Sequence, residues 1–192
     1  VDNAVIQVDG PEMPIMDGSS RYFVKAINKI GTIEQNANKK FYVIKEKIVY
    51  TDPKNNIEII AYPDETFSLD VHIDYNSRIL GYQYAKLNSL KNFTEEVSTC
   101  RTFVFFHELE FLLKNNLIKG GDLENAIVIM EKEVPQIELD RIADLFNKPH
   151  IQIKPEGILN NLDLRFSNEP ARHKLLDMVG DLALVGRRIK GK

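Results

Sequence analysis

The chain has 192 residues, 43% of them hydrophobic and 28% charged, which is typical of a globular domain with a buried core. The net charge of −3 gives no reason to expect nucleic acid or an anionic membrane surface as a partner, and no apolar run approaches the roughly 20 residues that span a bilayer. The single cysteine, Cys100, excludes an internal disulfide and a cysteine-based zinc knot. We therefore expect a cytoplasmic protein without stable membrane insertion.

The N-terminal part combines a predicted strand, a predicted helix and a candidate linker. The chain starts at Val1 without a methionine or a signal peptide, and we expect it to be cut from a longer chain. Residues Ala4–Val8 are rich in β-formers and predict a strand. Apolar residues repeat at helical spacing from Arg21 to Ile30, which predicts a helix. The polar stretch Gln35–Lys39 is the candidate linker.

A period of two follows the linker and favours an antiparallel meander. It predicts three strands separated by polar turns, at Phe41–Tyr50, Ile57–Tyr62 and Phe67–Tyr75. His72 alternates with apolar neighbours and is expected to point outward. We expect a short fourth strand at Gln83–Leu87 and a short helix at Thr94–Cys100.

The next segment predicts a compact β-α-β unit. The apolar run Arg101–Phe106 precedes a helix at His107–Leu117, and a turn at Lys119–Asp122 leads to a buried strand at Ala126–Met130. Its clustered phenylalanines fit either ordinary core or an apolar ligand channel, and both interpretations stay open. His107 is expected at the surface.

Residues 131–161 are interpreted as a peripheral excursion. Ile137–Phe146 is amphipathic and predicts a helix, and Lys148–Asn161 is loop-like, with His150 facing solvent. Leu162–Phe166 predicts a strand that leads into the last helix.

The last helix, predicted from Asn168 to Gly186, has an unusual polar side. Ser167 or Asn168 can cap its start. An apolar stripe covers most of its surface and leaves a narrow arc that holds four polar side chains, His173, Lys174, Asp177 and Asp181.

The spacing of this arc allows metal chemistry. An imidazole and a carboxylate one turn apart can take two positions on one metal ion, and a further carboxylate one turn on could orient a second histidine. The alternative is a half-buried helix in which His173 and Asp177 simply pair with each other. The spacing alone leaves both interpretations open.

Four sequence blocks together resemble UDP-3-O-acyl-N-acetylglucosamine deacetylase, the zinc amidase of lipid A biosynthesis. In chain order they are G-P-E-M-P-I-M-D-G-S (10–19), R-T-F-V-F (101–105), L-I-K-G-G-D-L-E-N-A-I-V (117–128) and R-H-K-L-L-D-M-V-G-D-L (172–182). The excursion at 131–161 resembles the longer forms in which the deacetylase is fused to a hydroxyacyl-carrier-protein dehydratase.

The resemblance implies an α+β fold, a two-layer sandwich of a mostly antiparallel sheet with helices on one face, plus a β-α-β insertion. Residues 1–37 would be the C-terminal tail of the first deacetylase domain. Residues 38–192 would be the second domain, truncated before its end, with the acyl-chain passage at 101–130. Apolar residues of the first tail, including Ile6, Ile15 and Ile27, would then be exposed or would seek another partner.

The resemblance also assigns roles within a zinc-dependent deacetylation of UDP-3-O-(3-hydroxyacyl)-N-acetylglucosamine. His173 and Asp177 match two zinc ligands, and Thr102 matches the threonine that stabilises the oxyanion. Lys174 matches a lysine that contacts the substrate, and Asp181 matches the carboxylate that holds the catalytic histidine. The acyl passage would be lined by Phe103, Phe105, Gly121, Leu123 and Val128.

Two motifs of the family are missing from these 192 residues. The third zinc ligand and the general-base glutamate come from a T-V-E-H motif of the first domain, and the catalytic histidine comes from a later G-H motif. We therefore expect the 192 residues alone to bind zinc weakly and to hydrolyse nothing, because a catalytic zinc site needs three protein ligands. The competing hypothesis is a non-catalytic relative that binds acyl-sugars or partner proteins. An unrelated metallohydrolase is hard to reconcile with four matching blocks.

Overall fold

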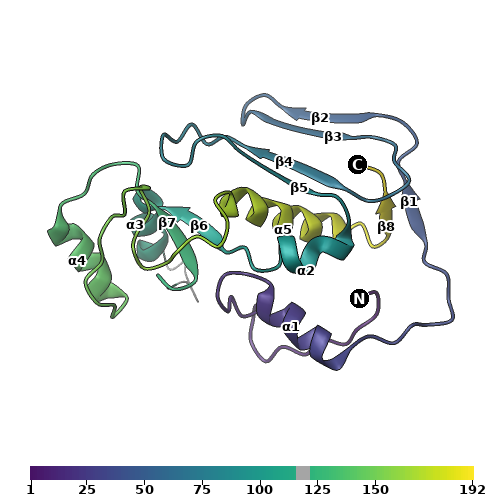
Figure 1. The fold of residues 1–192 in the computed structure, drawn as a ribbon, viewed down its shortest axis with the longest axis horizontal. Coiled ribbons are helices and arrows are strands. Elements are labelled where there is room, and N and C mark those ends of the chain that lie inside the picture. The colour runs from purple at the N-terminus through teal and green to yellow at the C-terminus, as the bar shows by residue number, and fades with distance from the viewer. Residues whose placement is uncertain (116–121) are drawn as a thin grey trace.

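The computed structural model describes residues 1–115 and 122–192, with helices and strands mixed along the chain (Figure 1), so the expected α+β class is confirmed. In chain order the elements are α1 (Arg21–Ile30), β1 (Phe41–Val43), β2 (Ile48–Asp52), β3 (Ile57–Ala61), β4 (Leu69–Ile73), β5 (Gln83–Leu87), the 3₁₀ helix η1 (Leu90–Asn92), α2 (Phe93–Glu96), β6 (Thr102–Phe105), α3 (Phe106–Lys114), β7 (Ala126–Ile129), α4 (Gln136–Leu145), α5 (Glu169–Ala183) and β8 (Arg188–Lys190). Among the described residues, none of the helices combines the length and apolar character needed to cross a bilayer.

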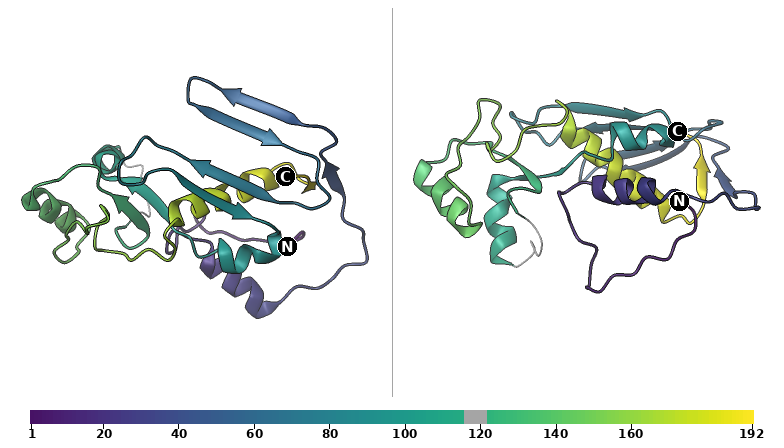
Figure 2. Two further views of the ribbon diagram at one scale, coloured as in Figure 1. Left: turned by 45° about the horizontal axis from the view of Figure 1, so that its top comes forward. Right: turned by 60° about the horizontal axis from the view of Figure 1, so that its bottom comes forward.

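The hairpin β4–β5 lies over α5 and forms the main core. Leu69, Val71 and Ile73 alternate along β4 and pack in one cluster with Leu175 of α5. Figures 1 and 2 show α5 running along one face of this hairpin, with α2 beside it. His72 lies on the opposite, exposed face, as the alternation predicted.

The predicted meander is wrong. The expected strand Phe41–Tyr50 is broken, because β1 pairs in parallel with β8 whereas β2 pairs antiparallel with β3. Within the described residues, each ladder joins only two strands. The returning C-terminal segment explains this arrangement: Ile44 N–H donates to Lys190 O at 2.9 Å, and Tyr62 N–H donates to Lys192 O at 2.7 Å.

Two further predicted strands are absent from the structure. Ala4–Val8 is irregular and exposed, and no strand lies beside it among the described residues. Leu162–Phe166 is irregular because side chains take its backbone groups: Lys154 Nζ donates to Leu162 O at 2.9 Å, and Arg165 N–H donates to a carboxylate of Glu169 at 2.6 Å. The helix expected at Thr94–Cys100 instead begins at Phe93 and ends at Glu96.

The predicted β-α-β unit is present. Strands β6 and β7 pair in parallel from Thr102↔Ala126 to Phe105↔Ile129, and α3 connects them, although the predicted end of its helix and most of the turn at 119–122 lie outside the described residues. Residues 131–161 supply α4 and buried Ile151 and Leu159, which close a second core against Val128. This second core lies at the opposite end of the elongated molecule from strands β1 and β8 (Figure 1).

Candidate active site

Helix α5 carries the candidate site, and its buried side fixes its position. Pro170 lies in the first turn, where no backbone N–H is needed, and Ala171 and Leu175 are fully buried against the β4–β5 hairpin. Asn168 does not cap the helix with its side chain: its amide donates to Tyr84 O at 2.8 Å and accepts from Arg172 Nε at 2.8 Å. Asn168 thus occupies the N-cap position, as one of the two predicted candidates, but its side chain makes tertiary contacts and no capping hydrogen bond.

His173 is buried and held in one orientation. It is 8% exposed, and its Nδ1 lies 3.0 Å from the Cys100 carbonyl oxygen. A carbonyl only accepts, so Nδ1 carries the proton and Nε2 keeps a free lone pair in the neutral ring. Burial lowers the pKa of His173 and outweighs the opposite effects of Cys100 O and Asp177. The imidazole is therefore held in the neutral form that binds metals.

The geometry of His173 and Asp177 fits two positions on one metal ion. Nε2 of His173 and Oδ1 of Asp177 are 3.5 Å apart. Zinc binds such ligands at about 2.0–2.2 Å, and two ligands at a tetrahedral angle are then about 3.4 Å apart. Among the described residues no group of three or more metal-binding side chains occurs. This chain thus offers a pair of donors that fits zinc.

Lys174 neutralises the other oxygen of the same carboxylate. Its Nζ lies 2.8 Å from Asp177 Oδ2 and 5.6 Å from the centre of the Phe103 ring. Burial lowers the pKa of Lys174, but the hydrogen bond to Asp177 and the nearby charge of Asp181 contribute to a net rise. Lys174 therefore remains a cation between the predicted metal ligands and the aromatic cluster. Asp181 itself is exposed one turn further along α5.

Thr102 begins β6 and is anchored by the turn that contains Gly18. The Thr102 N–H donates to Gly18 O at 2.9 Å, so the sequence block at 10–19 meets the block at 101–105. Gly18 has a φ of +77°, and a Cβ added to it would lie 1.7 Å from Asn125 O. Only glycine fits this contact.

The residues predicted to line an acyl passage lie on two sides of β6–β7. Phe103 and Phe105 lie edge-on to each other and to Tyr75, with ring centres 5.7 to 6.3 Å apart. Leu123 and Val128 are buried in the second core, on the side of α4. Gly121 lies outside the described residues. The structure thus brings four of the five residues together in two separate pairs, Phe103 with Phe105 and Leu123 with Val128.

Two features of the site were missed at the level of sequence. Tyr75, just beyond β4, joins the phenylalanine cluster, and its only sequence signal is an aromatic side chain at the end of an alternating run. Glu169 is fully buried against Arg101, yet in sequence it looks like an ordinary acidic residue of a first helical turn.

Two other histidines lie at the surface, as predicted. His107 is exposed and stacks on Phe105, with the ring centres 5.6 Å apart. His150 is also exposed and pairs with Asp140 at 2.9 Å.

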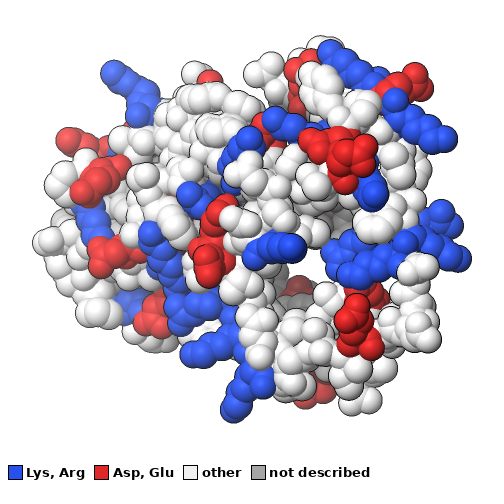
Figure 3. Space-filling model, turned by 45° about the vertical axis from the view of Figure 1, so that its right-hand side comes forward, with Lys and Arg blue, Asp and Glu red and all other residues white. Residues whose placement is uncertain are grey.

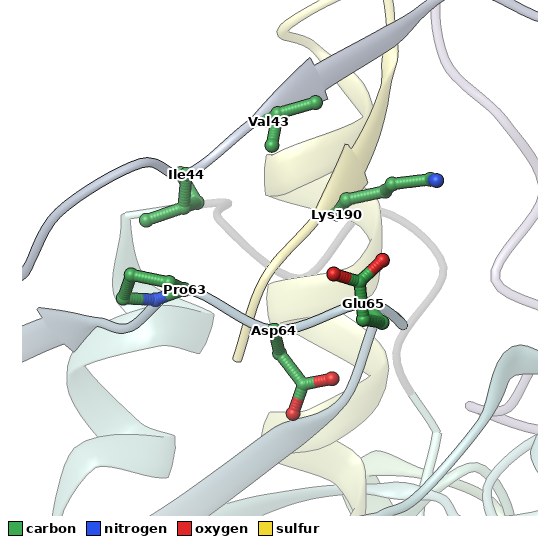
Figure 4. Close-up of a pocket in the computed structure, with 6 residues that line it drawn as sticks. All are labelled: Val43, Ile44, Pro63, Asp64, Glu65 and Lys190. Atoms are coloured by element: carbon green, nitrogen blue, oxygen red, sulfur yellow. The ribbon is translucent and has the colours of Figure 1, made fainter.

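A separate cavity lies away from all predicted site residues. It has a volume of about 380 Å³ and is lined by side chains of β1, β8 and the turn after β3 (Figure 4): Val43, Ile44, Pro63, Asp64, Glu65 and Lys190. The face of the molecule that carries β1 and β8 shows basic and acidic side chains interspersed (Figure 3). We do not assign this cavity to the chemistry of α5.

The site offers one pair of possible metal donors, a buried imidazole beside a carboxylate, with a lysine next to that carboxylate. The family model described as UDP-3-O-acyl N-acetylglycosamine deacetylase matches residues 1–148 and 142–192, and the chain belongs to this family.

Comparison with individual proteins agrees with this membership. The chain is 50% identical over 192 residues to the bifunctional enzyme LpxC/FabZ of Bacteroides thetaiotaomicron and 45% identical to that of Porphyromonas gingivalis, and it covers 42% of each. It is 34% identical to the UDP-3-O-acyl-N-acetylglucosamine deacetylase of Syntrophotalea carbinolica and covers 54% of that protein. The resemblance inferred from the four sequence blocks is thus confirmed.

Proposed function

We propose that the natural protein carrying this chain removes the acetyl group from UDP-3-O-(3-hydroxyacyl)-N-acetylglucosamine in lipid A biosynthesis. The proposal rests on one observation, the side-by-side placement of His173 and Asp177 on α5 in a chain that belongs to the deacetylase family. The chain spans between 42% and 54% of the length of the three relatives named above, so the activity is assigned to the whole protein.

In this proposal His173 and Asp177 hold a zinc ion. When bound, zinc polarises the amide carbonyl and acidifies a water molecule. Burial keeps His173 neutral, and the hydrogen bond to the Cys100 carbonyl places the proton on Nδ1, so that Nε2 stays available. The remaining ligand would come from another part of the natural protein.

The other polar residues act on charge that develops during hydrolysis. The Thr102 hydroxyl would donate to the oxyanion, since a donor placed at that position contributes a factor of about 10² to 10³ in rate. Lys174 would contact the substrate and hold the Asp177 carboxylate in place, because the two side chains already form an ion pair. Asp181 would orient a histidine supplied by the rest of the protein.

The acyl chain would run along the aromatic side of the β-α-β unit. Phe103 and Phe105, together with Tyr75, give an apolar surface that begins beside Lys174. Leu123 and Val128 would support this surface from behind through β7. We further propose a cytoplasmic location and, from the names of the bifunctional relatives, a dehydratase fused in the same natural chain.

The test is zinc-dependent acetate release by the natural protein. We expect activity to disappear on chelation, to return with zinc, and to fall more than about 100-fold in His173→Ala, because even the groups that orient a ligand are worth about 10- to 100-fold. The matched control is His150→Ala, which removes an exposed histidine and should leave the rate unchanged. A His173→Ala protein with full activity would overturn the proposal. Substrate binding without turnover by the wild type would favour the non-catalytic alternative.

A further inference from the structure

Glu169, the first residue of α5, is a fully buried carboxylate with every acceptor position used. Its Oε1 accepts from the backbone N–H and the Nε of Arg101, each at 2.9 Å. Its Oε2 accepts from Arg101 Nη2 at 3.1 Å and from the backbone N–H of Arg165 at 2.6 Å. The side chains of Arg101 and Glu169 are 4% and 0% exposed.

This ion pair shares its helix face and its partner segment with His173. Glu169 and His173 are one turn apart on α5 and therefore project in the same direction. Glu169 binds Arg101, and His173 binds the carbonyl of the preceding residue, Cys100. Helix α5 thus binds two consecutive residues, Cys100 and Arg101, which lie immediately before Thr102 at the start of β6.

A stabilising role alone does not account for a bidentate pair in this position. Burying two charges costs about as much as their attraction returns, so an apolar pair of similar volume would serve stability as well or better. A bidentate arginine and a carboxylate that accepts four hydrogen bonds fix the relative orientation of the segments they join, because each hydrogen bond constrains both a distance and an angle. Here they fix the orientation of residues 100–102 relative to α5.

We propose that Glu169, through Arg101, is the positioning residue that sets the orientation of His173 Nε2 and places Thr102 relative to it. This inference rests on the proposed function. Neither Glu169 nor Arg101 would contact the substrate. Together they would align the predicted metal ligand, His173, with the predicted oxyanion donor, Thr102.

The experiment is Glu169→Gln in the natural, zinc-loaded protein. The amide keeps the shape but turns one acceptor into a donor that faces the N–H groups of Arg101 and Arg165. We expect zinc affinity, measured by competition with a chromophoric chelator, to fall about 10- to 100-fold. We also expect the visible absorption of the cobalt-substituted protein to change, because cobalt reports ligand geometry. The matched control is Ile142→Ala in the second core, which should lower the melting temperature but leave affinity and spectrum unchanged.

A folded Glu169→Gln protein with wild-type zinc affinity and cobalt spectrum would overturn this inference alone. If that variant does not fold, Arg101→Lys provides the test, because it keeps the charge and loses the fork. A weakened affinity in Arg101→Lys would support the inference, and an unchanged one would overturn it. A wild-type protein that binds no zinc would overturn the proposed function together with this inference.

Discussion

At the scale of single residues, half-buried polar side chains connect segments that are far apart in sequence. Arg165 donates to Asp17 across 148 positions at 2.9 Å, and Ser20 Oγ donates to Ser98 O at 3.1 Å. Cys100 lies among these groups, and burial raises the pKa of its thiol to about 12. The sulfur is thus a protonated packing atom, and its backbone carbonyl is the part of Cys100 that orients His173.

Gly18→Ala should destabilise the chain. The residue adopts a φ of +77°, and an added Cβ would overlap Asn125 O. The left-handed conformation alone costs an alanine about 1–2 kcal/mol, and the clash adds to this. We expect the free energy of unfolding in urea to fall by at least about 2 kcal/mol.

Gly180→Ala is the matched control for that substitution. Gly180 lies in α5 with open space around it, and alanine is the better helix former by about 0.5–1 kcal/mol. This variant should be slightly more stable than the wild type. Equal effects of the two substitutions would contradict the tight contact at Gly18.

Asp17 should make stability depend on pH at the acidic end. Burial raises the pKa of its carboxyl, but hydrogen bonds from Ser19 and Arg165 outweigh this and hold the pKa below its ordinary value of 3.8. A lowered pKa means that the ionised form favours folding. The contribution is therefore complete above pH 3.8 and is lost as the pH falls through the folded-state pKa.

The comparison of wild type with Asp17→Asn measures this contribution. We expect the variant to be less stable at pH 7 and the difference to shrink as the pH is lowered below 3.8 in a series of urea unfolding curves. A difference that stays constant down to the acid transition would contradict the assignment.

At the scale of elements, sequence patterns predicted the helices and strands whose contacts are local in sequence. The bounds of α1 agree with the prediction, because an amphipathic period runs to a glycine that adopts φ +82° after the last turn. The predicted strand Gln83–Leu87 was also found, since its partner β4 lies close in sequence. Strand β8 was missed: Arg188–Lys190 is short and charged, and its partner β1 (Phe41–Val43) is far away in sequence.

The same limit applies to the site. The proximity of His173, Lys174 and Asp177 was predicted because one helix displays them at fixed spacing, and their roles stay predictions. Glu169 and Tyr75 were missed, because their roles depend on Arg101 and Phe103, which reach them only after folding. Periodicity records which side of an element is buried but not which partner covers it.

Leu175→Ala tests the packing of α5 against the hairpin. Leu175 is fully buried between α5 and β4–β5, and truncating such a leucine costs about 2–5 kcal/mol. Leu184, which is 85% exposed just after α5, is the control, and Leu184→Ala should change stability by less than about 0.5 kcal/mol. Thermal unfolding followed by circular dichroism measures both. Comparable shifts for the two leucines would argue against this packing.

At the scale of the whole molecule, the described residues form two cores joined by one parallel strand pair. Phe105 and Ile129 belong to the core under α5, whereas Val128 faces the core closed by α4. The N-terminal segment meets Thr102 through Gly18 but supplies no residue to the two core clusters: α1 has no buried residue, and Ile6, Ile15 and Ile27 are exposed, as expected. A displaced or intermolecular arrangement of this segment stays a hypothesis, and so does the inactivity of the 192 residues alone.

The parallel pairing of β1 with β8 has a consequence for synthesis of the protein on the ribosome. Phe41 and Arg188 are partners, so the ladder cannot form until residues 188–190 have left the exit tunnel. Until then the backbone N–H and C=O groups of β1, a segment rich in β-formers, have no partner strand at β8. Contacts between such distant positions slow folding, because the long loop must close first. We therefore expect chaperones to protect β1 during this period of synthesis.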